Sequence, residues 1–406
     1  MIQAYYQAMM VAETIKYGGG VMKNRKNNAF YTGLAWLMLC ALCSGCAKKK
    51  AAENVNAGDS GGLAVRYAEH FNIEYMQDGV KLVTDHYGRL CLLVPDGVEA
   101  PDVQADLLVR TPVKKAFFMS TTQAGLLDAL DDESLYDSVA AVTIPAEQWV
   151  INPVAEGLRS GRIRYIAQNN WGAMDIEAVI RLSPDITFAG VLNPGSDDFE
   201  QFDEAGLGYA VLGEWLEDSN YGSLEWIKFI AAFYNKDREA DAVFREKVAR
   251  LDELVKLTTD IPADKRPVVA SGSVYGGVVY TQGGDSITAR EYRKAGGRYF
   301  LEEGTGGGAL RITPEEFFDK ARDADILIYN SMIQYTPDKA ALLAESPLFS
   351  LFKSFKNDQI YVLSFGYYMN SAKMDVKFED TVSIFHPELP GLNGLKNLSF
   401  YEKLPD

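Results

Sequence analysis

Few side chains in this sequence have the types and spacing needed for covalent catalysis. The order Gly-Asp-Ser at 284–286 is that of a serine-hydrolase nucleophile, whose proton a nearby base must remove. The matching Asp-x-x-His is missing, because no aspartate stands three positions before His386. Residues 302–310 are rich in glycine but lack the Lys-Ser/Thr of a phosphate-binding loop. We therefore predict that the protein is not an enzyme, and keep a serine hydrolase acting through Ser286 as the alternative.

Ligands for a tightly held metal ion are scarce. The chain has 3 histidines and 4 cysteines, and a zinc centre takes several such side chains. His70, His86 and His386 lie far apart in the sequence, and we interpret all three as structural or surface residues. We predict no metal site and no cofactor of the protein's own.

Cys46 stands where a lipid could be attached. A basic cluster at 23–26, an apolar run at 29–43 and two small residues precede it, an order typical of a secretory signal. The apolar run is shorter than the about 20 residues that span a bilayer. The stretch resembles a bacterial lipobox, with Cys43 where leucine is usual, and this resemblance implies lipidation of Cys46. An uncleaved signal anchor is the alternative.

The beginning of the chain divides by composition. Residues 1–45 are predicted to be the signal, with 22–45 as the true signal and 1–21 as the product of a mis-assigned start. Residues 46–62 are small and polar, and we interpret them as a flexible, lipid-anchored tether. Residues 63–111 contain strand-like apolar runs around a turn and are predicted to form a β-rich first segment.

Charge and cysteine content narrow the class of protein. The chain has 406 residues and a formal net charge of −16, which argues against nucleic acid and against flat binding to anionic lipid. Cys91 is the only cysteine after Cys46, so the mature domain can have no internal disulfide. The length is sufficient for two domains or one bilobed unit held by apolar cores.

Short apolar runs alternate with amphipathic stretches from residue 112 onward. This alternation is typical of βαβ units and predicts an α/β fold with parallel strands. We expect an N-terminal α/β lobe at 112–222 and a C-terminal α/β lobe at 259–406. Strands are predicted at 116–120, 138–144, 162–168, 183–190, 209–214, 266–272, 325–330 and 359–365.

The segment between these lobes has a different pattern. Residues 223–258 contain neither proline nor glycine, and their apolar residues recur at helical spacing. They are predicted to form one long helix, or two in tandem with a bend at 235–237, that joins the lobes.

Four segments resemble sequence blocks of the substrate-binding proteins that serve ABC importers for iron-siderophores, haem and cobalamin. The resemblance covers residues 112–390 and leaves 63–111 outside; Ala324 stands where the family usually has proline. The four segments are 162–190 (RIRYIAQNNWGAMDIEAVIRLSPDITFAG), 223–241 (SLEWIKFIAAFYNKDREAD), 280–300 (YTQGGDSITAREYRKAGGRYF) and 310–330 (LRITPEEFFDKARDADILIYN).

The resemblance implies both a fold and a role. The fold would be two Rossmann-like lobes with parallel-rich sheets, joined by one long rigid helix, with the ligand between them. The role would be that of an exported, lipid-anchored protein, facing the periplasm or cell exterior, that delivers an iron-siderophore-type chelate to an ABC permease and ATPase. Cobalamin or haem is the alternative ligand, and a lipid-anchored serine hydrolase is the alternative class.

Candidate ligand contacts follow the predicted strands. Ligands of open α/β sheets bind at the carboxyl ends of strands, and aromatic side chains there suit a bulky, flat ligand. The same rings could instead pack the lobe interface, while Arg290 could meet an anionic group. The candidates are Thr121, Trp149, Asn170, Trp171, Tyr221, Tyr275, Tyr280, Arg290, Tyr367 and Tyr368.

Two glutamates are candidates for contact with the permease. The resemblance implies one exposed glutamate on each lobe that meets arginines of the permease, and residue-by-residue matching gives Glu177 and Glu315. Each begins a predicted helix, where a carboxylate also stabilises the helix dipole by about 0.3–1 kcal/mol. That local role is the alternative.

Overall fold

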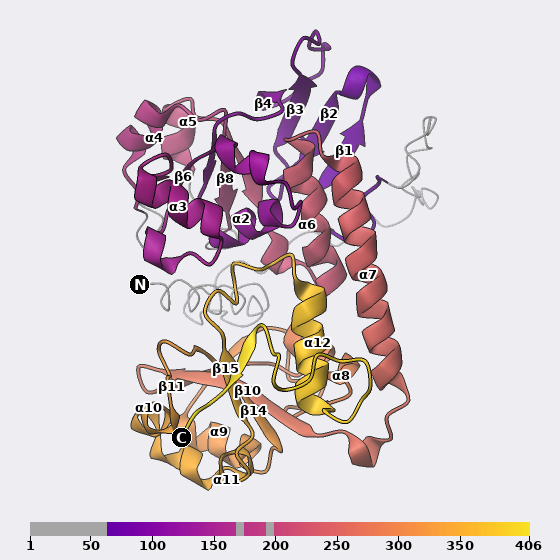
Figure 1. The fold of residues 1–406 in the computed structure, drawn as a ribbon, viewed down its shortest axis with the longest axis vertical. Coiled ribbons are helices and arrows are strands. Elements are labelled where there is room, and N and C mark those ends of the chain that lie inside the picture. The colour runs from indigo at the N-terminus through magenta and orange to yellow at the C-terminus, as the bar shows by residue number, and fades with distance from the viewer. Residues whose placement is uncertain (1–62, 168–173, 192–198) are drawn as a thin grey trace, which may run out of the picture.

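The computed structural model describes residues 63–167, 174–191 and 199–406. Cys46, Asn170 and Trp171 lie outside the described residues, as do the expected signal and tether within 1–62. The described chain forms two lobes, stacked one above the other in Figure 1, and helix α7 (Asp237–Thr259) runs alongside both.

The first lobe is built on a five-stranded parallel sheet in the order β7-β6-β5-β8-β9. Its central strands consist almost wholly of buried residues, as expected for a parallel sheet covered on both faces. The chain order reverses between β5 and β8, and ligands of such sheets bind at the carboxyl side of the reversal. The elements are β5 (Ala116–Phe118), α2 (Thr121–Asp128), β6 (Val139–Val142), α3 (Asn152–Ser160), β7 (Arg164–Tyr165), α4 (Ile176–Leu182), β8 (Ile186–Gly190), α5 (Glu200–Glu204) and β9 (Tyr209–Leu212).

The second lobe contains a seven-stranded sheet in the order β13-β11-β10-β14-β15-β16, with β12 beside β10. Its centre is parallel, whereas β11, β13 and β16 pair antiparallel with their neighbours. The predicted α/β class is confirmed. The antiparallel strands at the edges of this sheet were not predicted. The elements are β10 (Val268–Tyr275), β11 (Val278–Gln282), α8 (Ile287–Lys294), β12 (Arg298–Tyr299), β13 (Ala309–Ile312), α9 (Pro314–Ala321), β14 (Ile326–Met332), α10 (Lys339–Glu345), α11 (Lys353–Lys356), β15 (Ile360–Leu363), α12 (Met374–Phe385) and β16 (Tyr401–Lys403).

The chain segment that connects the two main sheets forms two consecutive helices. Helix α6 (Asn220–Ala232) is buried within the first lobe, and α7, 23 residues long, continues along the second lobe (Figure 1). The turn between them contains Asn235 at φ 55°, a left-handed conformation that interrupts a helix and that asparagine tolerates. The connection is therefore made by α7, and not by one helix through the whole segment.

Helix α12 lies alongside the lower part of α7 (Figure 1). Lys247 of α7 pairs with Asp375 of α12 at 3.2 Å, and Arg250 pairs with Glu379 at 2.9 Å. Both pairs are at least partly shielded from water, which makes them stronger than a fully exposed pair. They hold the connecting helix against the second lobe.

Residues 63–111 add a small four-stranded sheet to the first lobe. Its strands are β1 (Asn72–Tyr75), β2 (Lys81–Thr84), β3 (Leu90–Pro95) and β4 (Leu107–Thr111), in that order. Phe71 packs on Trp226 and Phe229 of α6, with ring centroids 4.6 and 5.5 Å apart. The small sheet thereby shares the hydrophobic core that surrounds α6.

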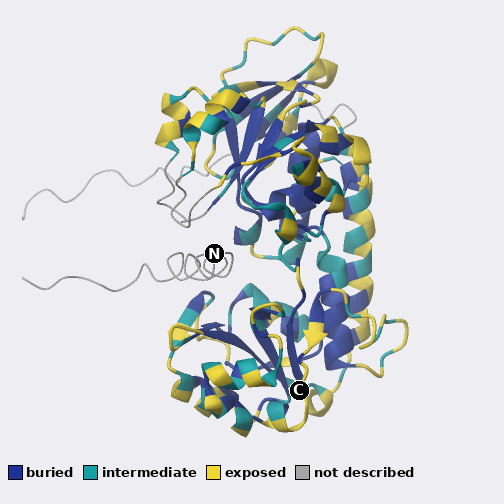
Figure 2. Cartoon of the chain, turned by 60° about the vertical axis from the view of Figure 1, so that its left-hand side comes forward, coloured by how far each residue is buried: buried dark blue, intermediate teal, exposed yellow. Residues whose placement is uncertain are grey.

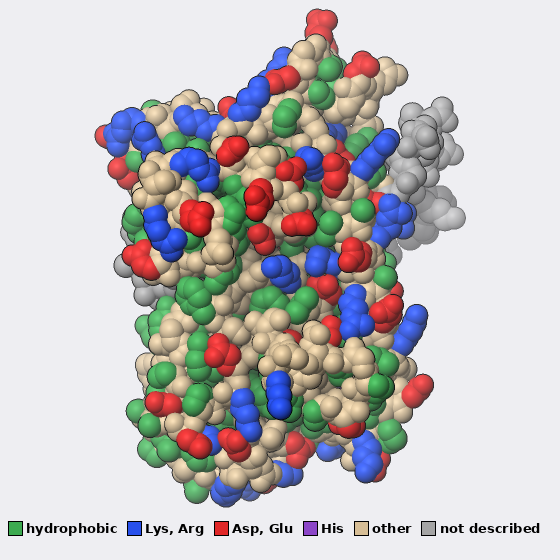
Figure 3. All heavy atoms as spheres, in the orientation of Figure 1, with side chains coloured by type: hydrophobic (Ala, Val, Ile, Leu, Met, Phe, Trp, Pro, Cys, Tyr) green, Lys and Arg blue, Asp and Glu red, His purple; other side chains and the backbone are tan. Residues whose placement is uncertain are grey.

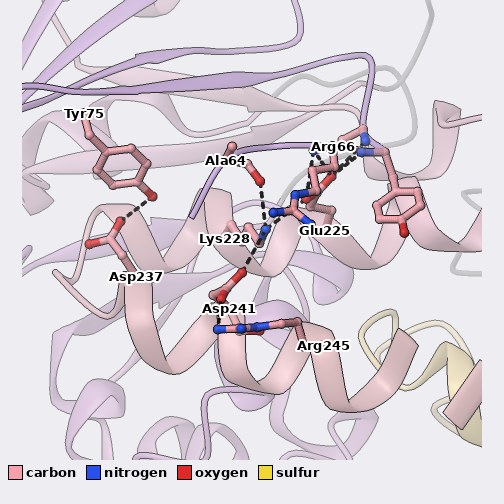
Figure 4. Close-up of polar contacts among 10 residues, drawn as sticks. Ala64, Arg66, Tyr75, Glu225, Lys228, Asp237, Asp241 and Arg245 are labelled. Carbon is pink, nitrogen blue, oxygen red and sulfur yellow. Dashed lines mark hydrogen bonds and ion pairs between the residues drawn. The ribbon is translucent and has the colours of Figure 1, made fainter. Parts of the chain in front are cut away.

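A buried polar network ties the start of the described chain to α6 and α7 (Figure 4). The Glu225 carboxylate accepts hydrogen bonds from the main-chain N–H groups of residues 66–68, at 2.7–3.0 Å. Lys228 Nζ lies 3.0 Å from Glu225 Oε1 and 3.2 Å from Asp241 Oδ1, and donates to the main-chain oxygen of Ala64 at 3.1 Å. These side chains are almost fully buried, so each charge depends on its partners for solvation.

Burial follows the layers of the fold. The sheets of both lobes are mostly buried, and exposed residues lie on the outer helices and loops (Figure 2). Acidic and basic side chains are interspersed over the face drawn in Figure 3, so the net negative charge does not form a single patch there.

Cys91 is fully buried in β3, and burial raises the pKa of its thiol to about 12. Within the described residues, no helix combines the length and hydropathy needed to cross a bilayer.

Candidate ligand-binding site

A cavity of about 280 Å³ lies between the two lobes and is walled by both. Thr122, Glu214 and Asn220 contribute from the first lobe and α6. Leu363 at the end of β15 and Gln282 at the end of β11 contribute from the second. The cavity thus lies at the strand ends where a ligand is expected in such sheets.

The loop after β5 places Thr122 in the wall. Ser120 caps α2: its hydroxyl accepts from the main-chain N–H of Thr122 at 3.3 Å, while its own N–H donates to Gln123 Oε1 at 3.0 Å. This capping box fixes the first turn of the helix at the reversal of the sheet. Thr122 Oγ1 is consequently held beside Glu214, to which it donates a hydrogen bond.

Glu214 is a carboxyl group that is costly to ionise. It lies in the short 3-10 helix η4 (Glu214–Leu216) after β9 and is buried, with Thr122 bonded to Oε1. Burial raises the pKa of this carboxyl above its usual value, because few groups around it replace water. Its Oε2 has no hydrogen-bond partner among the described residues, so it is available to a ligand.

Four tyrosines form much of the lower wall. They come from α8, from the loop after β15 and from β16, and are Tyr292, Tyr367, Tyr368 and Tyr401. The Tyr367 ring lies 5.1 Å from that of Tyr368 and 5.6 Å from that of Tyr401. Burial raises the pKa of all four hydroxyls, which keeps them neutral and able to donate hydrogen bonds near neutral pH.

Helix α12 presents one face to the cavity, at Met374, Lys377, Phe378 and Thr381. These positions are three and four residues apart and therefore lie on one side of a helix. Lys377 is only 7% exposed, and its Nζ lies 4.4 Å from the Tyr367 ring centroid and 5.4 Å from that of Phe400.

The Lys377 ammonium has unusual surroundings. Within the described part of the chain, its Nζ forms no hydrogen bond or ion pair. It makes cation–π contacts with the rings of Tyr367 and Phe400. Burial lowers the pKa of this ammonium to about 7. A buried charge without a partner is unfavourable, so the site is prepared for an incoming anion.

The loop at 364–373 closes against α2 on one side of the cavity. Ser371 Oγ donates to the main-chain oxygen of Thr122 at 2.8 Å. Gly125 lies so close to this loop that an added Cβ would stand 1.7 Å from the main-chain oxygen of Met369. Only glycine permits this approach of the two lobes.

A second set of contacts joins α8 to the first residue of α6 and to Asp218 just before that helix. Asn220 Nδ2 donates to Glu291 Oε2 at 2.8 Å, and Arg290 donates to the main-chain oxygen of Asp218 at 2.8 Å. Glu291 is also paired with Lys294 at 2.8 Å. The lobes are therefore hydrogen-bonded to each other in two separate places around the cavity.

Some of the ligand-contact candidates predicted from the sequence line the cavity, and others lie elsewhere. Tyr367 and Tyr368 line the cavity, and Thr122 lines it in place of the neighbouring candidate Thr121. Arg290 lies outside the lining and donates to main-chain oxygens of Asp218 and Asp285.

The remaining described candidates do not line this cavity. Trp149 is buried and its indole N–H donates to the main-chain oxygen of Ile144 at 3.1 Å. Tyr221 stacks on Tyr67 and bonds to Asp252. Tyr275 ends β10 and is 48% exposed, and Tyr280 lies in β11 beside Arg311. Asn170 and Trp171 lie outside the described residues.

Lys377, Glu214, Tyr292 and Tyr401 were not among the sequence candidates. The sequence candidates were taken from loops after predicted strands, and Lys377 lies on one face of a helix, so this search could not find it. The available signal was a single lysine within an apolar stripe, because Met374, Phe378 and Thr381 surround it at helical spacing.

The candidate docking glutamates occupy equivalent positions on the two lobes. Glu177 is in the first turn of α4 and Glu315 in the first turn of α9, and both are exposed. Glu177 pairs with Arg181 at 3.3 Å. Thr313 caps α9 by accepting from the main-chain N–H of Glu316 at 3.1 Å.

Ser286 has a structural task in the described fold. Its buried hydroxyl caps α8 by accepting from the main-chain N–H of Ala289 at 3.1 Å. Its neighbour Asp285 accepts from the main-chain N–H groups of Gly304 and Gly306, which lowers the pKa of that carboxyl. His386 Nε2 instead lies 3.1 Å from the main-chain oxygen of Gly296. Within the described residues, Ser286 and His386 are thus each engaged with main-chain groups.

Comparison with known proteins gives a consistent result. The sequence model of a family described as periplasmic binding protein matches residues 121–366. Two uncharacterised lipoproteins of Methanocaldococcus jannaschii are 24% and 26% identical, over 88% and 84% of this chain and 92% and 86% of their own.

Solved structures share the fold. A periplasmic solute-binding protein from Veillonella parvula superposes with a TM-score of 0.57 at 14% identity, over 76% of this chain and 87% of that one. A periplasmic heme-binding protein from Pseudomonas aeruginosa gives 0.52 at 14% identity, over 72% and 100%.

Proposed function

Because this chain belongs to the periplasmic binding protein family, we propose that it captures an iron-siderophore-type chelate for an ABC importer. The observation that carries the proposal is the inter-lobe cavity, which combines aromatic walls with the ammonium of Lys377, unpaired within the part of the chain that the structure describes. Aromatic rings and a small number of polar groups are typical of small-molecule sites. A compact anionic chelate matches both properties.

The cavity size favours a compact ligand. Its volume of about 280 Å³ is near the lower end of the about 300–1,000 Å³ typical of small-molecule sites. Cobalamin is far larger than such ligands and would need the lobes to separate. Haem is intermediate, and both remain outcomes of the binding test below.

We also propose that Cys46 carries the lipid that anchors the protein outside the cytoplasm. The basic, apolar and small-residue order before Cys46 supports this, and the two archaeal relatives are named lipoproteins. Partnership with a permease and ATPase follows from the family, with Glu177 and Glu315 as the proposed contacts with the permease.

The test is direct binding to residues 63–406. Trp215 lines the cavity, with its indole N–H bonded to the main-chain oxygen of Val191 at 3.2 Å, so its fluorescence should report a ligand. We expect saturable quenching by a ferric chelate and a loss of that signal in Trp215→Phe, with binding by calorimetry retained. Binding by none of ferric citrate, ferrioxamine B, haemin and cyanocobalamin would overturn chelate capture.

A further inference from the structure

We propose that Lys377 binds a carboxylate of the ligand, and that the ligand carries little negative charge beyond it. This inference rests on the proposed capture of a chelate and names the chemistry that the cavity selects. It starts from two observations: a cavity between the lobes, and a buried ammonium in its wall that contacts two aromatic rings and has no ion-pair partner among the described residues.

The first step concerns the unsatisfied ammonium. Lys377 Nζ can donate three hydrogen bonds, and among the described residues it makes none. An anionic oxygen placed in the cavity would supply both the missing acceptor and the missing counter-charge. Charge-assisted hydrogen bonds of this kind are stronger than neutral ones, and most so where water is excluded.

The second step concerns the neighbours of that anion. The hydroxyls of Tyr367 and Tyr401 lie 3.3 Å apart, and both groups are neutral near neutral pH. Neutral hydroxyls can donate to a second carboxylate oxygen without adding charge. Glu214 lies in the same wall, where burial raises the pKa of its carboxyl and so disfavours a second negative charge beside the ligand.

The third step limits the charge of the ligand. Lys377 is the single Lys or Arg among the described residues that line the cavity. Glu291 also lines it, and Lys294 and Asn220 are already bonded to that carboxylate. One cation and an acidic neighbour suit one carboxylate, whereas a tris-catecholate ferric complex of charge −3 would leave most of its charge unpaired.

The position of Lys377 is held by the C-terminal strand. Asp380, three residues later on α12, accepts from the main-chain N–H groups of Ser399 and Phe400 at 2.8 and 2.7 Å. This holds the Phe400 ring near the ammonium, whose Nζ also lies over the Tyr367 ring. Among the described residues, the lysine is therefore positioned by packing rather than by a carboxylate partner.

A carboxylate could come from two sources, a ferric chelate with one free carboxylate arm or the propionates of haem. Two probe pairs distinguish them. N-succinyl ferrioxamine B is a hydroxamate chelate with one free carboxylate, and N-acetyl ferrioxamine B has the same chelate with none. Haemin has two propionates, and haemin dimethyl ester has the same macrocycle with both esterified.

The experiment is calorimetry with residues 63–406 and the variants Lys377→Met, Lys377→Arg and Lys320→Met. Lys320 is the control, because it is exposed on α9 of the same lobe, lies 4.0 Å from Glu316 and does not line the cavity. We expect one carboxylate probe to bind, Lys377→Met to weaken it about 10- to 100-fold, and Lys377→Arg to retain part of the affinity. Lys320→Met should leave it unchanged.

The outcomes separate the two proposals. Equal affinity of the wild type and Lys377→Met for the carboxylate probe would overturn the role of Lys377 and leave chelate capture in place. Tight binding of N-acetyl ferrioxamine B or haemin dimethyl ester, with no preference for its carboxylate counterpart, would do the same. Binding of no probe at all would overturn chelate capture itself. A thermal unfolding scan of each variant shows whether a loss of affinity comes from misfolding.

Discussion

Ser371 of the second lobe donates a hydrogen bond to the main-chain oxygen of Thr122 in the first lobe, at 2.8 Å. Thr122 in turn bonds to Glu214, so the contact between lobes and the polar wall of the cavity share one residue. The distance between the lobes and the arrangement of the site are therefore linked.

Gly125→Ala should disturb this link most. The new Cβ would stand 1.7 Å from the Met369 oxygen, so the loop at 364–373 must move away from α2. Overpacking of this kind costs about 1–3 kcal/mol, which should appear as a five- to hundred-fold loss of chelate affinity, about tenfold per 1.4 kcal/mol. Ser371→Ala is the comparison, because it removes only one hydrogen bond, and a larger loss in Ser371→Ala would contradict this account.

Glu225→Ala should destabilise the fold. It removes the acceptor for the N–H groups of residues 66–68 and one partner of the buried Lys228. Breaking a buried pair typically costs about 3–5 kcal/mol, measured here as the free energy of unfolding in urea. Glu253→Ala is the control, since its pair with Arg250 is exposed and should be worth under about 1 kcal/mol. Similar effects of both changes would refute the importance of the buried network.

Lys377→Met should stabilise the protein at neutral pH. Burial lowers the pKa of the folded-state ammonium to about 7 from 10.5, so the unfolded chain takes up the proton first as pH falls. The native lysine therefore costs stability that increases from pH 10 down to 7 and is constant below that. The variant should unfold at higher urea by roughly 1–4 kcal/mol at pH 7, and the gain should shrink towards pH 10. A gain that does not change with pH would contradict the assignment.

Carboxylate binding should draw a proton onto Lys377. An anion beside the ammonium raises its pKa, so at pH 8 the free lysine is mostly neutral and the bound one is charged. Calorimetry in two buffers of different ionisation enthalpy should give an uptake approaching one proton per ligand at pH 8 and little uptake at pH 6. In Lys377→Met the uptake at pH 8 should disappear. Glu214→Gln tests whether that carboxyl, whose pKa is raised by burial, contributes to the proton uptake.

Other titratable groups also lie around the cavity. They are Glu214 on η4, Glu291 and Tyr292 on α8, Tyr367 and Tyr368 after β15, Asp380 on α12 and Tyr401 on β16.

Charge reversal at Glu177 and Glu315 together should abolish uptake in cells and leave chelate affinity unchanged. Both carboxylates are exposed and lie in the first turn of a helix, so each change should cost stability only about 0.3–1 kcal/mol, and paired surface charges mainly orient docking. Glu316→Lys is the neighbouring control, because Glu316 is next to Glu315 and is weakly paired with Lys320. Loss of chelate binding in the purified double variant, or equal loss of transport in Glu316→Lys, would argue against docking.

The alternation of strands and helices was predictable because each short strand is apolar throughout. Strands β5 and β9 are wholly buried, and such runs are recognisable in isolation. The break between α6 and α7 could be anticipated at Asn235, a residue that tolerates a left-handed backbone. The family resemblance rested on similar local blocks, and the matched region at 121–366 confirms it.

The site was harder to predict because distant segments create it. A lysine among apolar residues on one helix does not by itself identify a ligand site, and Lys377 becomes buried when Phe400 and Tyr367 pack over it. Strand β16 is three residues long, and it pairs with β15 through residues about 40 positions apart in the chain. Trp149, one of the aromatic candidates, instead donates its indole N–H within its own lobe.

Cys91 has a practical consequence. It is the one thiol of residues 63–406, it is fully buried, and the pKa of about 12 keeps it from forming the reactive thiolate. The domain should therefore fold equally well under reducing and oxidising conditions. One cysteine introduced on the surface of each lobe would then be the only sites that accept a maleimide dye, so energy transfer between two dyes could follow the lobes as they close.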